Sequence, residues 1–328
     1  MIKKTIIPRK QNTYSSFPTL TTFEDQIFLF YRQGTSYKRQ MHGLRGRVNS
    51  WSIKKEILTN LFNTQHHTIY NKGYERTVFQ SNGQNELDSI VSKINNNLYS
   101  LTTRIWEPQK INQSYISISS SPHFTNRLEV NVPELQWFVF YGKAFSSEHG
   151  YIFPAYGSIH KEPGERPFLL STNDFINWRI LSTIELNKKY ILNESSILYH
   201  NEKYHIFMRD NVFPFAIWHS TSKNLINWSV PVKKIPYAHA PMGISHQDKV
   251  YLSYRDLSIA NKHATSIIDP FSSNVKPIRV DEYIGNLYDG GYSDLLVIDN
   301  SILSVHYSGN TFAEPYIKTC LVPLEQLP

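Results

Sequence analysis

The amino-acid sequence predicts an all-β fold, a single six-bladed β-propeller domain that spans residues 1–328. Three observations favour this class. Aromatic residues make up 14% of the chain, and Asn, Ser and Thr are abundant, which is typical of strands and turns. A segment with the pattern of a β-hairpin recurs six times along the sequence. A separate turn motif occurs twice, and repeats of this kind are typical of propeller blades.

The six hairpin segments share one layout, in which an apolar run, a short polar turn and a second apolar run follow one another. We expect each to form the two innermost strands of one blade. In the second, fourth and fifth segments, a polar residue at the entry precedes an arginine at the exit by 15 or 16 positions. The segments are FPTLTTFEDQIFLFYRQG (residues 17–34), LDSIVSKINNNLYSLTTRIW (87–106), FPAYGSIHKEPGERPFLLS (153–171), NESSILYHNEKYHIFMRD (193–210), HAPMGISHQDKVYLSYRDL (239–257) and GYSDLLVIDNSILSVHYSG (291–309).

Two octapeptides supply the second repeat, STNDFINW at residues 171–178 and TSKNLINW at residues 221–228. Asn and Asp side chains bond to their own backbone in such turns, and the tryptophan can cover the hydrophobic layer beneath. Their offset of 50 residues predicts the same corner of two neighbouring blades. Residues 56–86 are the least regular part, for which we expect the outer strand of the first blade and a long loop near the mouth. No amphipathic helix and no linker between domains is expected.

Composition excludes several classes of protein. The net charge of +7 favours anionic partners, but no long basic run or recognised motif accompanies it, so we expect no nucleic acid. The sequence contains no run of about 18 apolar residues, so no membrane span is predicted. Residues 1–14 lack the apolar core of a secretory signal, which is compatible with the cytoplasm or with export by another route. The single cysteine, Cys320, lies in an apolar setting and is expected in a buried strand. We expect neither a cofactor nor a metal.

If the hairpins are the innermost strands, their ends converge on the propeller axis. Several arginines around one cavity repel one another unless a carboxylate or sulfate neutralises them, and arginine binds such groups in bidentate geometry. The alternative is that each arginine pairs with a nearby acid, as Arg209 could with Asp210. The residues expected to converge are Arg32, Arg104, Arg209, Arg255, Asp88, Glu194, His239, Tyr292 and Asp294.

Three of these features together resemble the sialidase superfamily: the Glu194-to-Arg209 hairpin, the YSDL segment that contains Tyr292, and the two turn motifs. The resemblance implies a six-bladed propeller with degenerate Asp-box turns, in which Phe175 and Leu225 occupy the family's glycine position. It also implies that Glu194 polarises Tyr292, which attacks the anomeric carbon. Arg209 and Arg255 match two arginines that grip the carboxylate of the substrate.

The sequence departs from the family pattern at two places. Ser16 stands where the family has its first arginine, so Arg32 or Arg104 would have to supply that charge. The segment QGTSYKRQMHGLRGRVNSW, residues 33–51, contains no Asp or Glu, although the family's acid/base aspartate is expected there. His42 or Asp88 would then take that role, with His239 and Asp294 as further substrate contacts.

The predicted function is hydrolysis of a glycosidic bond to a terminal acidic sugar, sialic acid or a related keto-sugar acid. A tyrosine is a weak nucleophile unless a carboxylate accepts its proton, and Glu194 would do so. Two alternatives stay open. A polysaccharide lyase would use arginine to neutralise a uronate and His or Tyr to remove its C5 proton. A non-catalytic propeller would bind an acidic glycan without turnover.

Overall fold

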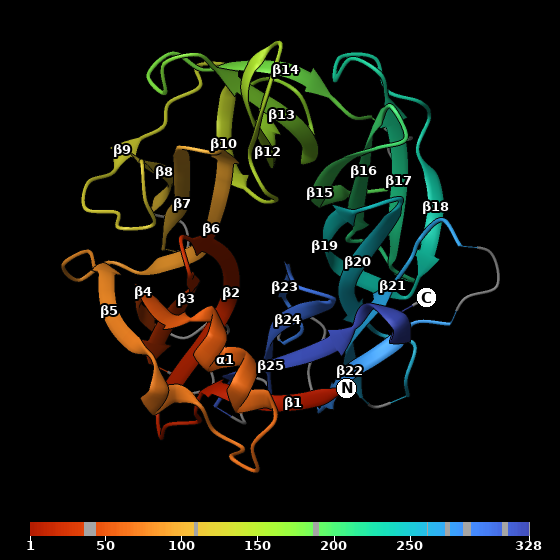
Figure 1. Ribbon diagram of the computed structural model, residues 1–328. Coiled ribbons are helices and arrows are strands. Elements are labelled where there is room, and N and C mark those ends of the chain that lie inside the picture. The colour runs from red at the N-terminus through yellow and green to blue at the C-terminus, as the bar shows by residue number, and fades with distance from the viewer. Residues whose placement is uncertain are drawn as a thin grey trace.

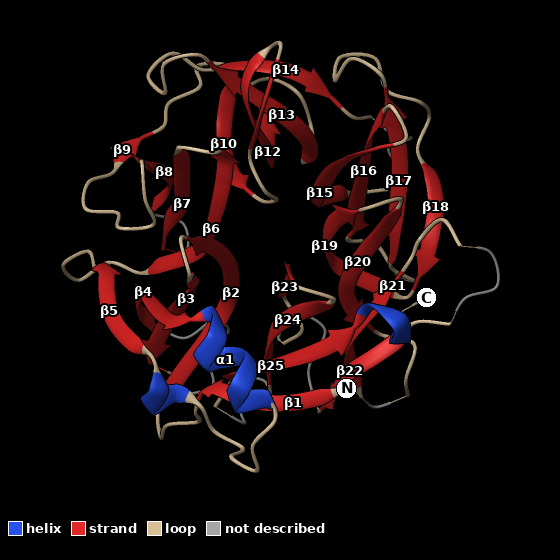
Figure 2. Ribbon diagram, viewed as in Figure 1, coloured by secondary structure: helices blue, strands red, loops and turns tan. Residues whose placement is uncertain are grey.

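Six antiparallel sheets surround a common axis in the computed structural model, as the sequence predicted (Figure 1). The structure describes residues 1–35, 44–107, 111–185, 190–260, 262–272, 276–284, 290–309 and 314–327. Strands account for nearly all of the regular structure (Figure 2). The fold is therefore an all-β six-bladed propeller of the sialidase-like type.

The blades follow one another along the chain, and each is given from its innermost strand outward. Blade 1 contains β2 (Thr13–Phe23), β3 (Gln26–Thr35), β4 (Leu44–Lys54) and β5 (Tyr74–Phe79). Blade 2 contains β6 (Glu86–Asn95), β7 (Leu98–Glu107), β8 (Ile111–Ser119) and β9 (Leu128–Glu129). Blade 3 contains β10 (Leu135–Phe140) with β11 (Phe145–Ser147), then β12 (Gly150–Ile159), β13 (Arg166–Thr172) and β14 (Arg179–Thr183).

The second half repeats the plan. Blade 4 contains β15 (Leu192–His200), β16 (Lys203–Asp210), β17 (Ala216–Ser222) and β18 (Val232–Pro236). Blade 5 contains β19 (Ala238–His246), β20 (Lys249–Asp256), β21 (His263–Ile268) and β22 (Ile278–Tyr283). Blade 6 contains β23 (Ser293–Ile298), β24 (Ser301–Ser308), β25 (Tyr316–Pro323) and, as its outer strand, β1 (Ile2–Ile7).

The ring of blades is closed within blade 6, because the first strand of the chain, β1, pairs with the last, β25. Ile2 lies opposite Leu321 in the antiparallel β1–β25 ladder. Blade 6 is also tied to blade 5 by Asp281, whose Oδ1 lies 2.8 Å from Nζ of Lys318. Nε2 of His306 lies 3.4 Å from the other carboxylate oxygen, Oδ2. Closure of a propeller in this way leaves only short, protected sheet edges.

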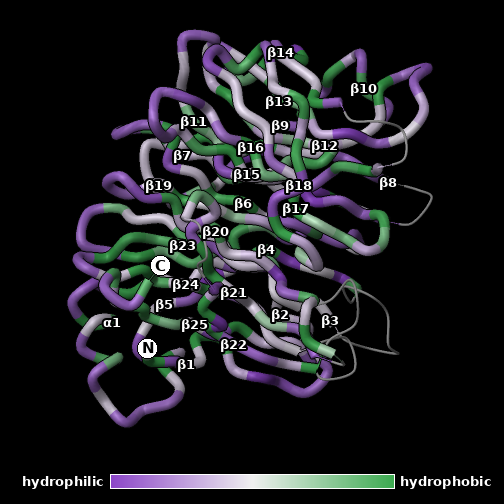
Figure 3. Tube along the Cα trace, turned by 90° about the vertical axis from the view of Figure 1, so that its right-hand side faces the viewer, coloured by the Kyte–Doolittle hydropathy of each residue, from purple (hydrophilic) through white to green (hydrophobic). Residues whose placement is uncertain are grey.

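The hydrophobic core is divided among the seams between blades. Phe28, Phe30 and Val48 of blade 1 pack against Val91 and Leu101 of blade 2, and similar clusters fill the other seams. Figure 3 shows hydrophobic stretches along the strands and hydrophilic ones mostly at the outer turns. Burial of one such side chain contributes on the order of 1.5–3 kcal/mol. The inner strands are thus fixed by their neighbours on both sides.

Five of the six predicted hairpins form the innermost strand pairs, and the third prediction is wrong. Residues 153–171 form β12 and β13, the second and third strands of blade 3. The true inner strand is broken into β10 and β11 around Gly142, which has φ of +106°. A Cβ at Gly142 would approach the Ser195 carbonyl oxygen to 2.5 Å, so the break lets two inner strands come close. A broken strand gives a weak pattern in the sequence.

The expectation of no helix is also corrected. The helix α1 (Lys55–Phe62) connects β4 to β5 and buries Leu58, Leu61 and Phe62 along one side. Two single turns of 3₁₀-helix follow elsewhere, η2 (Tyr70–Lys72) and η3 (Leu324–Gln326). Because successive strands alternate in direction, α1 lies at the end of blade 1 opposite to the start of its inner strand. Residues 56–86 do contain the outer strand, but this connection lies away from the mouth.

The two octapeptides occupy equivalent corners, which confirms the predicted relation. They link β13 to β14 and β17 to β18, the third and fourth strands of neighbouring blades. Phe175 and Leu225 have φ of 62° and 61°, the left-handed region that favours glycine. Asp174 and Asn224 close the turns by accepting hydrogen bonds from backbone N–H groups two and three residues later.

Cys320 is fully buried in β25, as predicted. Within the described ranges, no helix is long and apolar enough to cross a membrane.

Candidate active site

The inner strands all begin at one end of the propeller, and the second strands end there. Asp88 and Glu194 are the third residues of β6 and β15, while Arg104 and Arg209 are the seventh residues of β7 and β16. Tyr292 immediately precedes β23. The repeat therefore places residues from three different blades at one end of the axis, as the sequence predicted.

Tyr292, Glu194 and Arg209 form a closed triangle of polar contacts. The Tyr292 hydroxyl donates to Oε1 of Glu194 at 2.5 Å. Nη1 of Arg209 lies 2.8 Å from Oε2 of Glu194 and also donates to the Tyr292 hydroxyl at 3.2 Å. All three side chains are buried, with relative exposures between 5% and 8%. The tyrosine proton thus points at a carboxylate whose other oxygen is neutralised by a guanidinium.

The charges of this triangle stabilise one another. Burial raises the pKa of Tyr292, and the Glu194 carboxylate raises it further, so the phenol is neutral near pH 7. Burial lowers the pKa of Arg209, but the adjacent Glu194 carboxylate raises it by more, and the guanidinium stays charged. Nη2 of Arg209 also donates to the Asn211 side-chain oxygen at 2.8 Å, which fixes the plane of the fork.

Aromatic rings and a second arginine hold the Tyr292 ring. The Arg255 guanidinium lies 4.9 Å from the ring centroid, at cation–π distance. Phe17 contacts the ring edge-on at 4.9 Å, Tyr307 stacks on it at 6.0 Å, and Tyr141 contacts it at 6.1 Å. Nε of Arg255 donates to the carbonyl oxygen of Gly290 at 2.6 Å. The position of the Tyr292 oxygen is therefore set by packing on several sides.

Asp88 and Arg104 form a second ion pair near the triangle. Nη2 of Arg104 lies 2.7 Å from Oδ2 of Asp88, and both side chains are partly accessible. Burial raises the pKa of Asp88, while Arg104 lowers it and Glu194 raises it. A cavity of about 20 Å³ lies between Asp88 and Tyr292 and is also lined by Phe17 and Met242. It has room for about one water-sized group.

Arg32, by contrast, is directed into the seam between blades 1 and 2. Its Nε donates to the Glu86 carbonyl oxygen at 2.6 Å, and Nη2 donates to the Asn85 side-chain oxygen at 2.8 Å. Burial lowers its pKa to about 10, although Tyr14 and Asp88 act in the opposite direction. Gly46 permits this packing, because a Cβ there would lie 2.6 Å from Arg32 Nε. The described contacts of Arg32 are thus structural ones.

Among the described side chains, no hydrogen bond or ion pair joins His239 or Asp294 to the triangle. His239 is fully buried and packs edge-on against Phe215 at 4.5 Å. Burial lowers its pKa, and the charges of Arg209 and Arg255 lower it further, so the imidazole is neutral. His42 lies outside the residues that the structure describes.

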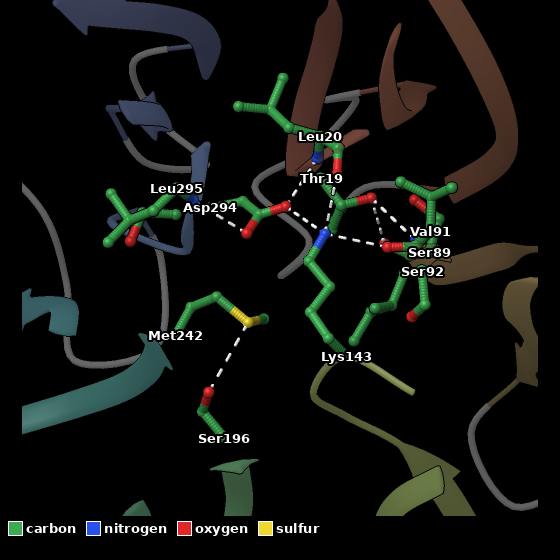
Figure 4. A network of polar contacts seen from close by, with 12 residues as sticks. Thr19, Leu20, Ser89, Val91, Ser92, Lys143, Ser196, Met242, Asp294 and Leu295 are labelled. Carbon is green, nitrogen blue, oxygen red and sulfur yellow. Dashed lines mark hydrogen bonds and ion pairs between the residues drawn. The ribbon is translucent and has the colours of Figure 1, made fainter. Parts of the chain in front are cut away.

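Asp294 lies instead in an axial network with Lys143 (Figure 4). Nζ of Lys143 lies 2.5 Å from Oδ2 of Asp294 and donates to the carbonyl oxygens of Leu20 and Val91 at 2.9 Å each. The same Asp294 oxygen accepts the Leu20 N–H at 2.6 Å. One lysine from the break between β10 and β11 thus ties the inner strands of blades 1, 2 and 6 together.

Sequence reasoning missed two residues near the triangle. Tyr156 is the seventh residue of β12, the position that an arginine holds in β7, β16 and β20. Burial raises its pKa, and the charges of Arg104 and Glu194 also act on it. The correct alignment of blade 3 would have found it. The second is Glu165, at the end of the β12–β13 loop, which carries no repeat signal in the sequence.

No group of three or more His, Cys, Asp or Glu side chains among the described residues is placed to hold a metal ion. The candidate site joins a neutral phenol, a carboxylate that accepts its hydrogen bond, and arginines from several blades. The fold and this constellation define the class as a six-bladed propeller of sialidase-like architecture.

Comparison with known proteins agrees with this class at the level of fold. No protein-family model and no curated protein sequence matches the chain. A Dyadobacter fermentans protein of unknown function has a similar structure, with a TM-score of 0.78 and 13% identity over 98% of each chain. Trypanosoma rangeli sialidase, as a covalent intermediate with 2,3-difluorosialic acid, is also similar, with a TM-score of 0.69 and 10% identity over 99% of this chain. The chain spans 59% of that sialidase.

A third similar structure is the α-L-arabinanase of Penicillium chrysogenum in complex with arabinobiose. Its TM-score is 0.67 at 8% identity, over 100% of this chain and 99% of the arabinanase. Two of these three neighbours are glycosidases, so the chain has a fold on which glycoside hydrolysis occurs. At identities of 8% to 13%, these similarities show the architecture alone.

Proposed function

We propose that this protein is a glycoside hydrolase of sialidase-like type, which releases a terminal acidic sugar such as sialic acid or a related keto-sugar acid. The observation that carries the proposal is the 2.5 Å hydrogen bond from Tyr292 to Glu194, with Arg209 in contact with both. A buried phenol paired with a carboxylate is the arrangement that a tyrosine nucleophile requires.

The chemistry of a 2-keto sugar acid explains why the nucleophile is a tyrosine. Such a sugar bears a carboxylate on its anomeric carbon, which would repel a negatively charged nucleophile. The Tyr292 phenol is neutral because burial and Glu194 raise its pKa. As its oxygen bonds to the anomeric carbon, its proton passes to Glu194, and the leaving alcohol departs with a proton from an acid. Water then displaces the tyrosine, which recovers its proton.

The arginines favour an acidic sugar over a neutral one. Arg209 donates to the Tyr292 hydroxyl, and Arg255 lies against the Tyr292 ring. Arg104 is paired with Asp88, which lines the cavity beside Tyr292. Three guanidinium groups and the two carboxylates of Glu194 and Asp88 meet at this end of the axis, and the excess of positive charge attracts an anion. The 20 Å³ cavity beside Tyr292 is too small for a sugar ring, so the ring would lie above the hydroxyl. Asp88 is a candidate acid/base, and His42 and Arg32 stay predictions from sequence.

The test is hydrolysis of 4-methylumbelliferyl α-sialoside, compared with 4-nitrophenyl α-L-arabinofuranoside. We expect turnover of the sialoside alone, and a covalent adduct on the Tyr292 peptide after incubation with 2,3-difluorosialic acid, detected by mass spectrometry. Turnover of the arabinoside alone would refute the acidic substrate. An adduct on Glu194 would refute the tyrosine nucleophile, and an unsaturated product from uronans would assign a lyase.

A further inference from the structure

Glu165 is a carboxylic acid beside the triangle that the scheme above leaves unused. It is the last residue of the loop between β12 and β13, and one of its oxygens accepts a hydrogen bond from Asn193 Nδ2 at 2.9 Å. Asn193 precedes Glu194 in β15, and its own side-chain oxygen accepts the Glu194 N–H at 2.8 Å. One amide side chain thus joins the Glu165 carboxyl to the backbone of the residue that polarises Tyr292.

The loop that carries Glu165 is held in place by its neighbour Arg166. Nη1 of Arg166 pairs with Glu162 at 2.7 Å and with Glu185 at 2.8 Å, and Nη2 donates to the Pro163 carbonyl oxygen at 3.2 Å. Arg166 is therefore engaged by two other carboxylates. For Glu165 itself, no ion pair occurs among the residues that the structure describes. The loop is braced, and this carboxyl alone is directed toward blade 4.

The surroundings of Glu165 suit an acid. Its side chain is half-buried, so it can lose and regain a proton through solvent at the mouth. Burial raises its pKa, while the Asn193 amide and the charge of Arg209 oppose this and the charge of Glu194 adds to it. A carboxyl that keeps its proton to higher pH than usual is what general acid catalysis near neutral pH requires.

Asp88 is less suited to the same role. Burial raises its pKa, as it does for Glu165, but its carboxylate is ion-paired with Arg104 at 2.7 Å, which opposes protonation and takes up one oxygen. The segment after the first hairpin, residues 33–51, contains no Asp or Glu at all. Glu165 on blade 3 therefore offers an acidic side chain that residues 33–51 of blade 1 do not supply.

We propose that Glu165 is the proton donor to the leaving group, an inference that rests on the proposed glycosidase function. As the Tyr292 oxygen bonds to the anomeric carbon, the glycosidic C–O bond breaks and the Glu165 proton goes to the departing oxygen, which leaves as an alcohol. In the second step the Glu165 carboxylate takes a proton from water, whose oxygen displaces Tyr292. Glu165 is then protonated again, and one water has been consumed.

The test compares Glu165→Gln with Glu162→Gln, a matched control on the same loop, and with Asp88→Asn, the rival acid. Two substrates separate protonation from nucleophilic attack, 3′-sialyllactose with a poor leaving group and 4-nitrophenyl α-sialoside with a good one. We expect Glu165→Gln to lower kcat/KM for sialyllactose on the order of 10²–10⁴-fold, and for the aryl sialoside less than 10-fold. The basic limb of its pH–rate profile should disappear.

The Glu162→Gln control separates a loss of the Glu165 carboxyl from a general disturbance of the loop. Glu162→Gln removes one contact of Arg166 and should keep both rates within about twofold, since surface ion pairs contribute little. Equal losses on both substrates with Glu165→Gln, or a leaving-group effect in Asp88→Asn instead, would overturn the assignment. If Glu165→Gln misfolds by circular dichroism, Glu165→Ala is used, with azide expected to restore turnover of the aryl sialoside as the glycosyl azide. Absence of that product counts against Glu165.

Failure of the inference can be told apart from failure of the function. A wild-type protein that hydrolyses neither sialoside refutes the proposed function, and the role of Glu165 with it. A wild-type protein that hydrolyses both, with Glu165→Gln unchanged, refutes only the proton donor.

Discussion

Replacement of Tyr292 by Phe removes one oxygen from the centre of the site and tests the nucleophile directly. The ring contacts with Phe17, Arg255 and Tyr307 stay available to phenylalanine, because they involve the ring and not the hydroxyl. What is lost is the hydrogen bond to Glu194 at 2.5 Å and the atom that would bond to the anomeric carbon.

Two magnitudes follow from this geometry. Without the nucleophile, we expect kcat/KM for the aryl sialoside to fall by at least about 10³-fold, which corresponds to about 4 kcal/mol of activation free energy. The unfolding free energy should change much less. Glu194 keeps Arg209 at 2.8 Å, so loss of one hydrogen bond to a charged group costs roughly 1–2 kcal/mol. In a chain of this length that is a decrease in Tm of roughly 2–3 °C.

The assay pairs steady-state kinetics on 4-methylumbelliferyl α-sialoside with thermal unfolding, and the control is Tyr99→Phe. The Tyr99 hydroxyl is also on a buried ring, but it donates to the Thr22 carbonyl oxygen at 3.0 Å, within blades 1 and 2. This control should lose a similar amount of stability and no activity. If Tyr292→Phe retains more than about a tenth of the wild-type rate while folded, the covalent mechanism is wrong.

Three further substitutions test the charges, each by urea unfolding. Arg209→Met leaves the Glu194 carboxylate buried without its cation and should cost about 3–5 kcal/mol; a loss below 1 kcal/mol would contradict this. Lys143→Met leaves the Asp294 carboxylate buried without its cation and should cost a similar amount of stability. The KM of the folded variant should not change, and a raised KM would place Lys143 in the site. Burial raises the pKa of Asp281, but its contacts with His306 and Lys318 lower it by more, below the unfolded value of 3.8. Asp281→Asn should therefore destabilise at pH 7, a difference that shrinks as the pH falls below about 3.8. A pH-independent difference would contradict that shift.

The sequence predicted the fold from its repeats because each blade repeats the same local pattern. Hairpins with regular alternation, such as residues 193–210, form the expected strand pairs, and their ends meet at the axis. The inner strand of blade 3 was not predicted, because Lys143 points to the axis there and the strand is interrupted around it. The helix α1 was not predicted, because eight residues are too few to give a clear helical period of apolar residues.

The site was predictable to the extent that it follows the repeat. Glu194, Arg209 and Tyr292 occupy repeat positions, and the structure brings them into contact. Arg32 occupies the same strand position as Arg209, yet its guanidinium binds Asn85 and Glu86 at the start of blade 2 and so lies in the seam between blades 1 and 2. Glu165 lies in a loop, where position depends on packing and not on any period.

The pairing of β1 with β25 has a consequence for the order in which the candidate site is assembled during synthesis. A ribosome adds about 5–20 residues per second, so β1 waits on the order of 15–60 s before β25 is made. Tyr292 belongs to that last blade, whereas Glu194 and Arg209 are made much earlier. The carboxylate and its guanidinium can pair while the sixth blade is absent, but the phenol arrives with the strands that close the ring. A partly synthesised chain would therefore hold the Glu194–Arg209 ion pair before it holds the Tyr292 hydroxyl that contacts both side chains.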